Sequence, residues 1–172
     1  LTMAVSAEQI ANLRKMFEEE LASDAAAYHP VDIERVRTEK WQVKRFILDQ
    51  PDQDLTKALA VLCKSLQWKK SFGVHDRTDQ YFPKEMWQQM GTELVGKDKH
   101  GRVVHWEVVR RRRFFKETSL LAKQFLAHTM ERTDRVAGET GCVAVGDSKG
   151  ASIWNIDTEF EQFKIELIEN HF

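Results

Sequence analysis

The stretch GCVAVGDSKGASIW, Gly141 to Trp154, comes closest to a chemical motif. Its GDSKG centre could be a phosphate-binding loop, a serine-nucleophile loop or the turn at the end of a buried strand. A phosphate-binding P-loop has the pattern GxxxxGK[ST], but here Lys149 precedes Gly150 and the glycine spacing is one residue short. A serine protease loop needs a histidine base nearby, and the sequence around Ser148 supplies none. The pattern therefore favours the turn, where Asp and Gly suit the backbone geometry.

The histidines and cysteines form no recognisable catalytic or metal-binding pattern. The six histidines contain no HExxH motif, and Cys63 and Cys142 form no CxxC pattern. His105 is distinctive because it interrupts the apolar segment VVHWEVV. Both a hydrogen-bonded histidine within a sheet and a ligand contact remain open for it. The sequence predicts no enzyme, no metal site and no cofactor.

A run of four arginines follows that apolar segment and precedes Phe114 and Phe115. Cations beside aromatic side chains can contact an anionic membrane, each contributing about 1 kcal/mol if it reaches the headgroups. The alternative is solvated loop charge paired with nearby glutamates. The candidate membrane contacts are Arg110, Arg111, Arg112 and Arg113.

The charge balance argues against nucleic acid as a partner, and the hydropathy argues against a membrane-spanning segment. The 172 residues include 26 basic and 27 acidic side chains, for a formal net charge of -1, so the overall field does not favour nucleic acid. No apolar run reaches the roughly 18 to 20 residues that cross a bilayer. The first residues also lack the basic and apolar regions of a secretory signal. We expect a cytoplasmic protein that is peripheral to membranes.

The first half of the chain has the apolar spacing of helices. Ser6 with Gln9 forms a capping box pattern, and Asp54 is placed to cap a further helix. Gly73 suits the left-handed end of that helix. The sequence predicts a helical module over residues 1–92.

The second half has strands as well as helices. Residues 103–109 and 142–145 predict two strands, each followed or preceded by a helical segment, the last of them capped by Asp157. Residues 93–172 are therefore predicted to form the first half of an α/β domain with a mixed, mainly parallel sheet and flanking helices. Two strands are too few for an independent sheet. We expect further strands from residues outside this chain, or a homodimer through the exposed strand edge.

Three segments, in this order, resemble the CRAL-TRIO, or Sec14-like, lipid-binding domain. They are ALAVLCKSLQWKKSFGV, GKDKHGRVVHWEV and GCVAVGDSKGAS, which are similar to the family patterns L..L..SL.WRK..G, K.D..GRPV and DLKGIS. The segment MFEEELASDAAAYHPVDIERVRTEKW is also similar to the region that precedes this domain in motile sperm domain-containing proteins. The resemblance covers nearly the whole chain. It implies that the family domain continues past Phe172 with more strands and a gate helix, so that this chain holds the first half of the pocket.

The resemblance also implies a ligand site on the sheet. The headgroup positions of relatives fall on Leu94 and His105, and approximately on Cys142 and Ala144, none of which has the phenol or hydroxyl found there. By the two-residue period of a strand, two neighbours share the side of His105, while residues 104, 106 and 108 should face the packed helices. The candidate ligand-binding residues are Leu94, Val103, His105, Glu107, Cys142 and Ala144.

The function implied by the resemblance is binding of a lipid or another small hydrophobic molecule and its transfer between membranes. The basic pair that binds inositol phosphate in relatives falls near Pro51 and Asp52. Neither of these side chains can bind phosphate through a positive charge, so the identity of the lipid stays open. The alternative is a ligand-free module that tethers a protein partner or a membrane surface.

Overall fold

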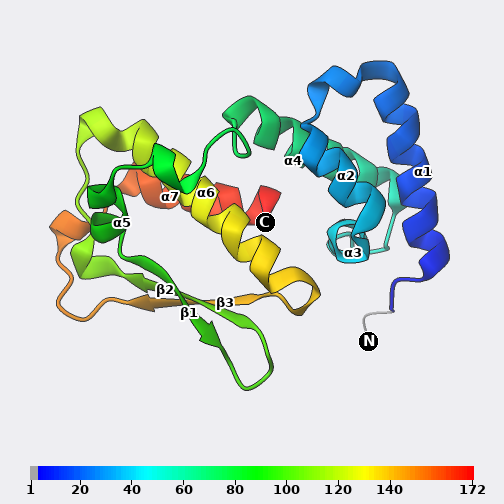
Figure 1. The fold of residues 1–172 in the computed structure, drawn as a ribbon. Helices are drawn as coiled ribbons and strands as arrows, with labels where there is room; N and C mark the ends of the chain where they lie inside the picture. Colours follow the sequence, from blue (N-terminus) through cyan, green and yellow to red (C-terminus); the bar gives the residue numbers. More distant parts are fainter. Residues whose placement is uncertain (1–3) are drawn as a thin grey trace. The chain divides into compact units, whose positions relative to one another are not determined.

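The structure, a computed structural model, describes residues 4–172 and is a mixed α/β fold (Figure 1). The chain forms two compact units that divide between His75 and Asp76. The sequence places the boundary later, between residues 92 and 93. None of the helices in residues 4–172 combines the length and the hydropathy that a bilayer span requires.

The first unit is built from four α-helices around one apolar core. Helices α1, α3 and α4 pack against one another, and α2 packs against α3. The sequence predictions for the helix ends are confirmed: Ser6 and Gln9 form the capping box, and the Asp54 carboxylate accepts hydrogen bonds from the first turn of α4. Gly73 ends α4 in the left-handed conformation. The bounds are α1 Ala7–Asp24, α2 Pro30–Thr38, α3 Lys40–Leu48 and α4 Leu55–Phe72.

The second unit combines three helices with a three-stranded sheet in the order β1-β2-β3. Strand β1 pairs antiparallel with β2, and β2 pairs parallel with β3. The mixed sheet is confirmed, and within residues 4–172 it has one pair of each kind where the sequence predicts a mainly parallel sheet. The bounds are α5 Lys84–Met90, β1 Thr92–Lys97, β2 Val103–Val108, α6 Ser119–Ala137, β3 Cys142–Asp147 and α7 Thr158–His171.

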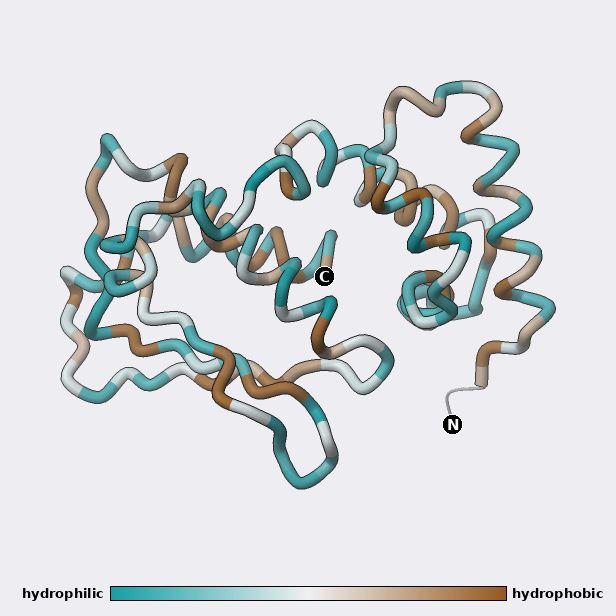
Figure 2. The backbone as a smooth tube through the Cα atoms, viewed as in Figure 1, coloured by the Kyte–Doolittle hydropathy of each residue, from teal (hydrophilic) through white to brown (hydrophobic). Residues whose placement is uncertain are grey.

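Strand β1 is a strand that the sequence analysis missed. It joins β2 through a hydrophilic hairpin, visible between them in Figure 2, and a bulge between Leu94 and Gly96 shifts its register. Its residues from Glu93 to Lys97 are exposed. The strand therefore depends on its hydrogen bonds to β2 more than on apolar burial.

Helices α6 and α7 lie on the same side of the sheet (Figure 1). His105 contacts Thr133 of α6, and Glu107 contacts Lys164 of α7, so these helices cover the face of β2 that carries Val103, His105 and Glu107. The expectation that residues 104, 106 and 108 face the helices is wrong for Val104 and Trp106, which stay partly exposed. The reason is that the covered face carries two polar residues, His105 and Glu107, whose partners on α6 and α7 make their burial possible. Hydrophobicity alone does not identify such a face.

Candidate functional site

A pocket of about 330 Å³ lies between the β1 side of the sheet and helices α5 and α6. Small-molecule pockets usually measure about 300 to 1,000 Å³, so this one is at the lower end of that range. Strands β1 and β2 provide one wall, and the side chains of α5 and α6 provide the other. The lining residues are Trp87, Thr92, Glu93, Leu94, His105, Thr129, Arg132 and Thr133.

Gly91 places β1 at the wall of this pocket. It ends α5 with a φ of 61°, a left-handed conformation that glycine adopts with little strain. Its carbonyl accepts a hydrogen bond from Val108 N at 2.8 Å, and a Cβ on Gly91 would lie only 2.6 Å from Val108 O. The chain can therefore turn from α5 into β1 this close to the end of β2 only because residue 91 has no side chain.

His105 is held in one orientation by the helix above it. Its Nδ1 lies 3.0 Å from Thr133 Oγ1, and Thr133 donates its own hydroxyl proton to Thr129 O at 2.8 Å. Since that hydroxyl has one proton, Nδ1 must be the donor to Thr133 Oγ1. The other ring nitrogen, Nε2, is buried without a hydrogen bond and lies 3.6 Å from Glu107 Oε1.

Glu107 is the centre of a buried ion cluster. Its Oε2 accepts hydrogen bonds from Arg112 Nη2 at 2.6 Å and from Lys164 Nζ at 2.7 Å. Arg112 Nη1 in turn donates to Glu161 at 2.5 Å. Burial by itself would raise the pKa of the Glu107 carboxyl, but His105, Lys164 and Arg112 together lower it from its ordinary 4.5 to about 2. The carboxylate stays charged and its contacts are taken, so Glu107 stabilises the packing of α7 on the sheet.

The strand register brings the predicted ligand-binding residues onto one face. Leu94, His105 and Ala144 are aligned across the three strands, and Val103 is paired with Cys142. The prediction that residues 103–109 and 142–145 form neighbouring strands is confirmed.

Only Leu94 and His105 of that set line the pocket. Val103 and Glu107 are buried beneath the helices, whereas Cys142 and Ala144 are exposed on β3. The site therefore contains two of the six predicted ligand-binding residues.

The four consecutive arginines have different surroundings. Arg112 lies inside the ion cluster with 3% of its side chain exposed, so it cannot reach a membrane surface from this position. Arg110 pairs with Asp147 at 3.0 Å and Arg111 pairs with Glu93 at 2.9 Å, and both remain about half-exposed. Three of the four candidate membrane contacts therefore reach solvent.

The GDSKG segment forms the turn that its composition predicts. Asp147 Oδ1 accepts a hydrogen bond from Lys149 N at 2.9 Å, and Gly150 has a φ of 72°. The hydrogen bond from the Lys149 backbone, together with the charge of Arg110, lowers the pKa of the Asp147 carboxyl. This residue shapes the loop after β3.

The helix side of the pocket was not predicted from the sequence. Thr129 and Thr133 are buried at i and i+4 on α6, and Arg132 lies beside them. The guanidinium of Arg132 sits 5.3 Å from the centroid of the Trp87 ring and 3.3 Å from Asp79 Oδ2. Two threonines one turn apart in an otherwise apolar helix face were the available signal, because such residues are seldom buried without a polar partner.

This lining can bind a molecule that has both an apolar and a polar part. Trp87 and Leu94 offer apolar contact, and the Arg132 guanidinium offers hydrogen-bond donors. In residues 4–172, no group of three or more His, Cys, Asp or Glu side chains is arranged to hold a metal ion.

No family model matches the chain. The CRAL-TRIO resemblance therefore rests on the sequence motifs, and the pocket must be interpreted from its own residues.

Proposed function

We propose that the protein binds a lipid or another small hydrophobic molecule, without enzymatic turnover, and transfers it between membranes in the cytoplasm. The observation that carries the proposal is the pocket beside β1. It contains Leu94 and His105, the two residues that the family resemblance assigns most directly to ligand contact. Leu94 and His105 are shared by the six candidate ligand-binding residues and the eight residues that line the pocket.

The pocket indicates what part of a ligand it would hold. A volume of about 330 Å³ suits a small hydrophobic molecule or one portion of a lipid more than a complete two-chain phospholipid. Each methylene buried against Trp87 and Leu94 would contribute about 0.8 kcal/mol. A polar or anionic end of the ligand would accept hydrogen bonds from the Arg132 guanidinium. The Arg132 side chain is 44% exposed, and its Nη1 is the atom that pairs with Asp79.

Native mass spectrometry of the full-length protein, purified from cells without detergent, tests the proposal. We expect a co-purifying hydrophobic molecule, and we expect Leu94→Asp to lose it because a carboxylate would replace an apolar pocket wall. Val95→Asp is the matched control, since Val95 is the next residue of β1, is exposed and does not line the pocket. A protein that carries no such molecule and refuses all offered lipids, or equal retention by both variants, would contradict the proposal.

A ligand-free tethering module is the second candidate. Several large apolar side chains outside the pocket are exposed, the most exposed being Trp154 at 84%, and exposed apolar groups often mark interaction surfaces. Under this alternative the mass spectrum shows no bound hydrophobic molecule. Purification from cells instead recovers a stable protein partner.

A further inference from the structure

The loops that follow β2 and β3 are joined into one structural feature, which we call the tip, made of residues 109–113 and 147–156. The buried Asn155 side chain ties them, since its Nδ2 donates to Arg110 O at 3.2 Å and to Arg112 O at 3.0 Å. Asn155 also closes a capping box on the short 3-10 turn that contains Ile153. The two loops therefore present their side chains from a fixed backbone.

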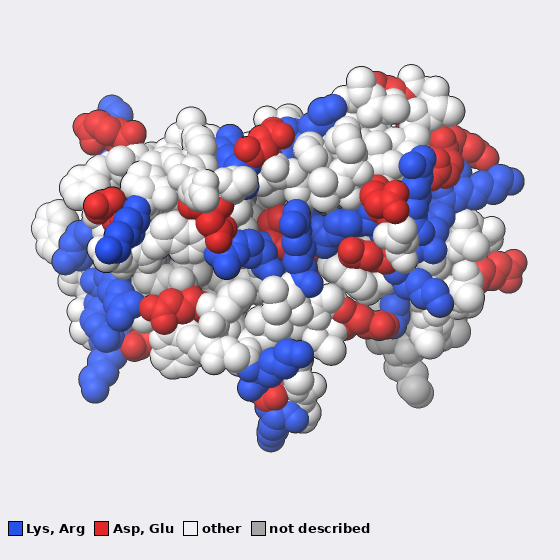
Figure 3. Space-filling model, in the orientation of Figure 1, with Lys and Arg blue, Asp and Glu red and all other residues white. Residues whose placement is uncertain are grey.

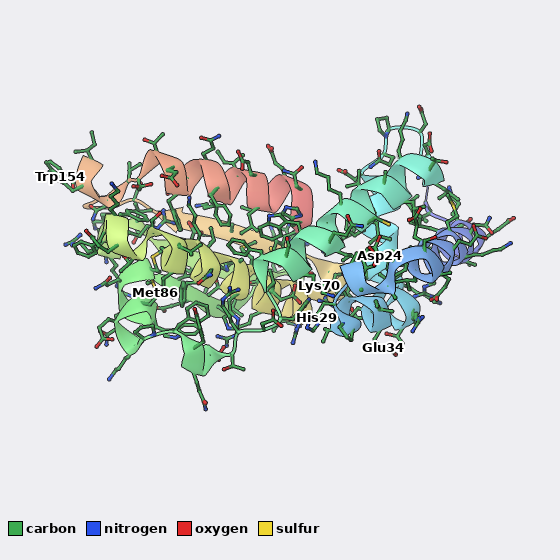
Figure 4. The ribbon with its side chains drawn as sticks, turned by 90° about the horizontal axis from the view of Figure 1, so that it is seen from above. Asp24, His29, Glu34, Lys70, Met86 and Trp154 are labelled. Atoms are coloured by element: carbon green, nitrogen blue, oxygen red, sulfur yellow. The ribbon has the colours of Figure 1, made fainter. Side chains whose placement is uncertain are left out.

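The tip exposes the two most solvent-accessible large apolar residues of the described chain. Trp154 is 84% exposed and Ile153 is 78% exposed, and Ile156 is 55% exposed. Figure 4 shows the side chain of Trp154 projecting outward from the end of the ribbon. Because the backbone beneath is held by Asn155, these side chains are displayed in water at a fixed place, which favours a partner that takes up apolar groups.

Cationic side chains surround this apolar group. Arg110 Nη1 donates to Lys149 O at 3.2 Å, which places the arginine run beside the loop after β3. Within residues 4–172, Arg113 and Lys149 make no ion pair with an acidic side chain, and Arg111 pairs with an exposed Glu93. Figure 3 shows Lys and Arg side chains gathered at this end of the second unit. A surface that attracts anions therefore encloses an apolar projection.

We propose that the tip docks on an anionic lipid bilayer by inserting Ile153, Trp154 and Ile156 into the interface. Tryptophan favours the headgroup region because its ring is apolar and its N–H is polar. Arg110, Arg113 and Lys149 would then lie at the level of the anionic headgroups.

An anionic bilayer fits the tip better than a protein surface for two reasons. The apolar residues form a small projection rather than a flat face. The charge around them is mainly basic, since Asp147, which pairs with Arg110, is the single acidic residue of the tip. The inference deepens the membrane contact of the proposed function and therefore rests on that part of it, but it needs no ligand in the pocket.

The test measures binding of the full-length protein to vesicles of phosphatidylcholine with and without phosphatidylserine. We expect binding to the anionic vesicles that weakens in high salt. Trp154→Ser should lower the partition coefficient about tenfold or more, since burial of a large apolar side chain contributes about 1.5 to 3 kcal/mol. Arg113→Ser should lower it about fivefold, from about 1 kcal/mol per cation.

Matched controls separate the tip from the rest of the surface. Ile165→Ser changes an apolar side chain of α7 that is 55% exposed outside the tip, and Arg102→Ser removes an exposed cation of the β1–β2 hairpin. Both should bind like the wild type, whereas Ile153→Ser should not. Quenching by brominated acyl chains, compared between wild type and Trp154→Phe, reports insertion of Trp154 as distinct from adsorption by charge.

Three results would overturn the proposal. They are failure of the wild type to bind anionic vesicles, equal binding by Trp154→Ser, and protection of Trp154 from acrylamide in the vesicle-free protein, which would mean that a protein surface already covers the tip. Vesicle binding is measured separately from the co-purifying molecule. Retained ligand with lost vesicle binding rejects the tip alone, and the reverse result rejects the ligand proposal alone.

Discussion

Replacing Glu107 by glutamine should destabilise the second unit in a pH-dependent way. The substitution keeps the shape of the side chain but removes the negative charge that faces Arg112 and Lys164 at 2.6 and 2.7 Å. Arg112 is buried and would retain only Glu161 as its carboxylate partner. Removing one member of a buried ion cluster is costly because the remaining charges lose their compensation.

The size and the sign of the effect follow from the pKa of Glu107. Its value is about 2 in the folded chain against an ordinary 4.5, and at about 1.4 kcal/mol per pKa unit this difference stabilises the fold by about 3 kcal/mol. A lowered acid pKa stabilises the protein above the unfolded pKa, and this contribution disappears as pH falls through the folded pKa. We therefore expect Glu107→Gln to lose about 3 kcal/mol at neutral pH, and the gap from wild type to close between about pH 5 and pH 2.

Urea titration at several pH values, followed by circular dichroism, measures this gap. Hydrogen exchange of the β2 amides assigns the transition to the second unit, which is necessary because the chain has two compact units. Glu93→Gln is the control: Glu93 pairs with Arg111 on the surface, and exposed pairs contribute at most about 1 kcal/mol. A gap that stays constant with pH, or one no larger than that of Glu93→Gln, would refute the role given to the cluster.

Two further predictions concern the packing of each unit. Gly91→Ala should destabilise by about 1 to 3 kcal/mol because its new Cβ would meet Val108 O at 2.6 Å. Gly101→Ala is the control, since Gly101 also has a positive φ, of 80°, but open space around it. Equal losses in the urea midpoints would attribute the effect to φ alone. Leu62→Ala, at a side chain with no exposed surface, should cost about 2 to 5 kcal/mol in the first unit, whereas Leu48→Ala at 40% exposure should cost far less in the same thermal or urea titration.

The helix ends and two strands could be predicted from the sequence because their signals are local. A side chain such as Ser6, Asp54 or Asp157 caps the helix that begins beside it. A continuous apolar run such as CVAV identifies a strand without reference to its partner. These features depend on a few consecutive residues, which the sequence displays directly.

Strand β1 could not be predicted in this way because its stability comes from its neighbour. TELVGK contains a glycine and two charged residues, and most of its side chains are exposed, so it lacks the alternation of a half-buried strand. Its pairing is visible only once Leu94 lies opposite His105. The pocket was missed for the same reason, since it forms between β1 and α6.

The covered face of the sheet was assigned to the wrong side because strand alternation shows which residues share a face and not which face is covered. On β2 the apolar Val104 and Trp106 stay partly exposed, while the polar His105 and Glu107 are buried. Each buried polar group contacts a partner far along the chain, Thr133 for His105 and Lys164 for Glu107. Only tertiary structure supplies those partners.

The same buried polar groups explain why the pocket opens at β1 rather than over the middle of the sheet. Above Glu107 the space is filled by Lys164 and Arg112, and above His105 Nδ1 it is filled by Thr133. Beyond them towards β1, the helix layer is bounded by the half-buried Trp87 and the exposed Arg132, and Leu94 stays 39% exposed. The pocket therefore opens where the edge strand passes the end of this cluster, so that the charges which hold α7 on the sheet also limit the pocket.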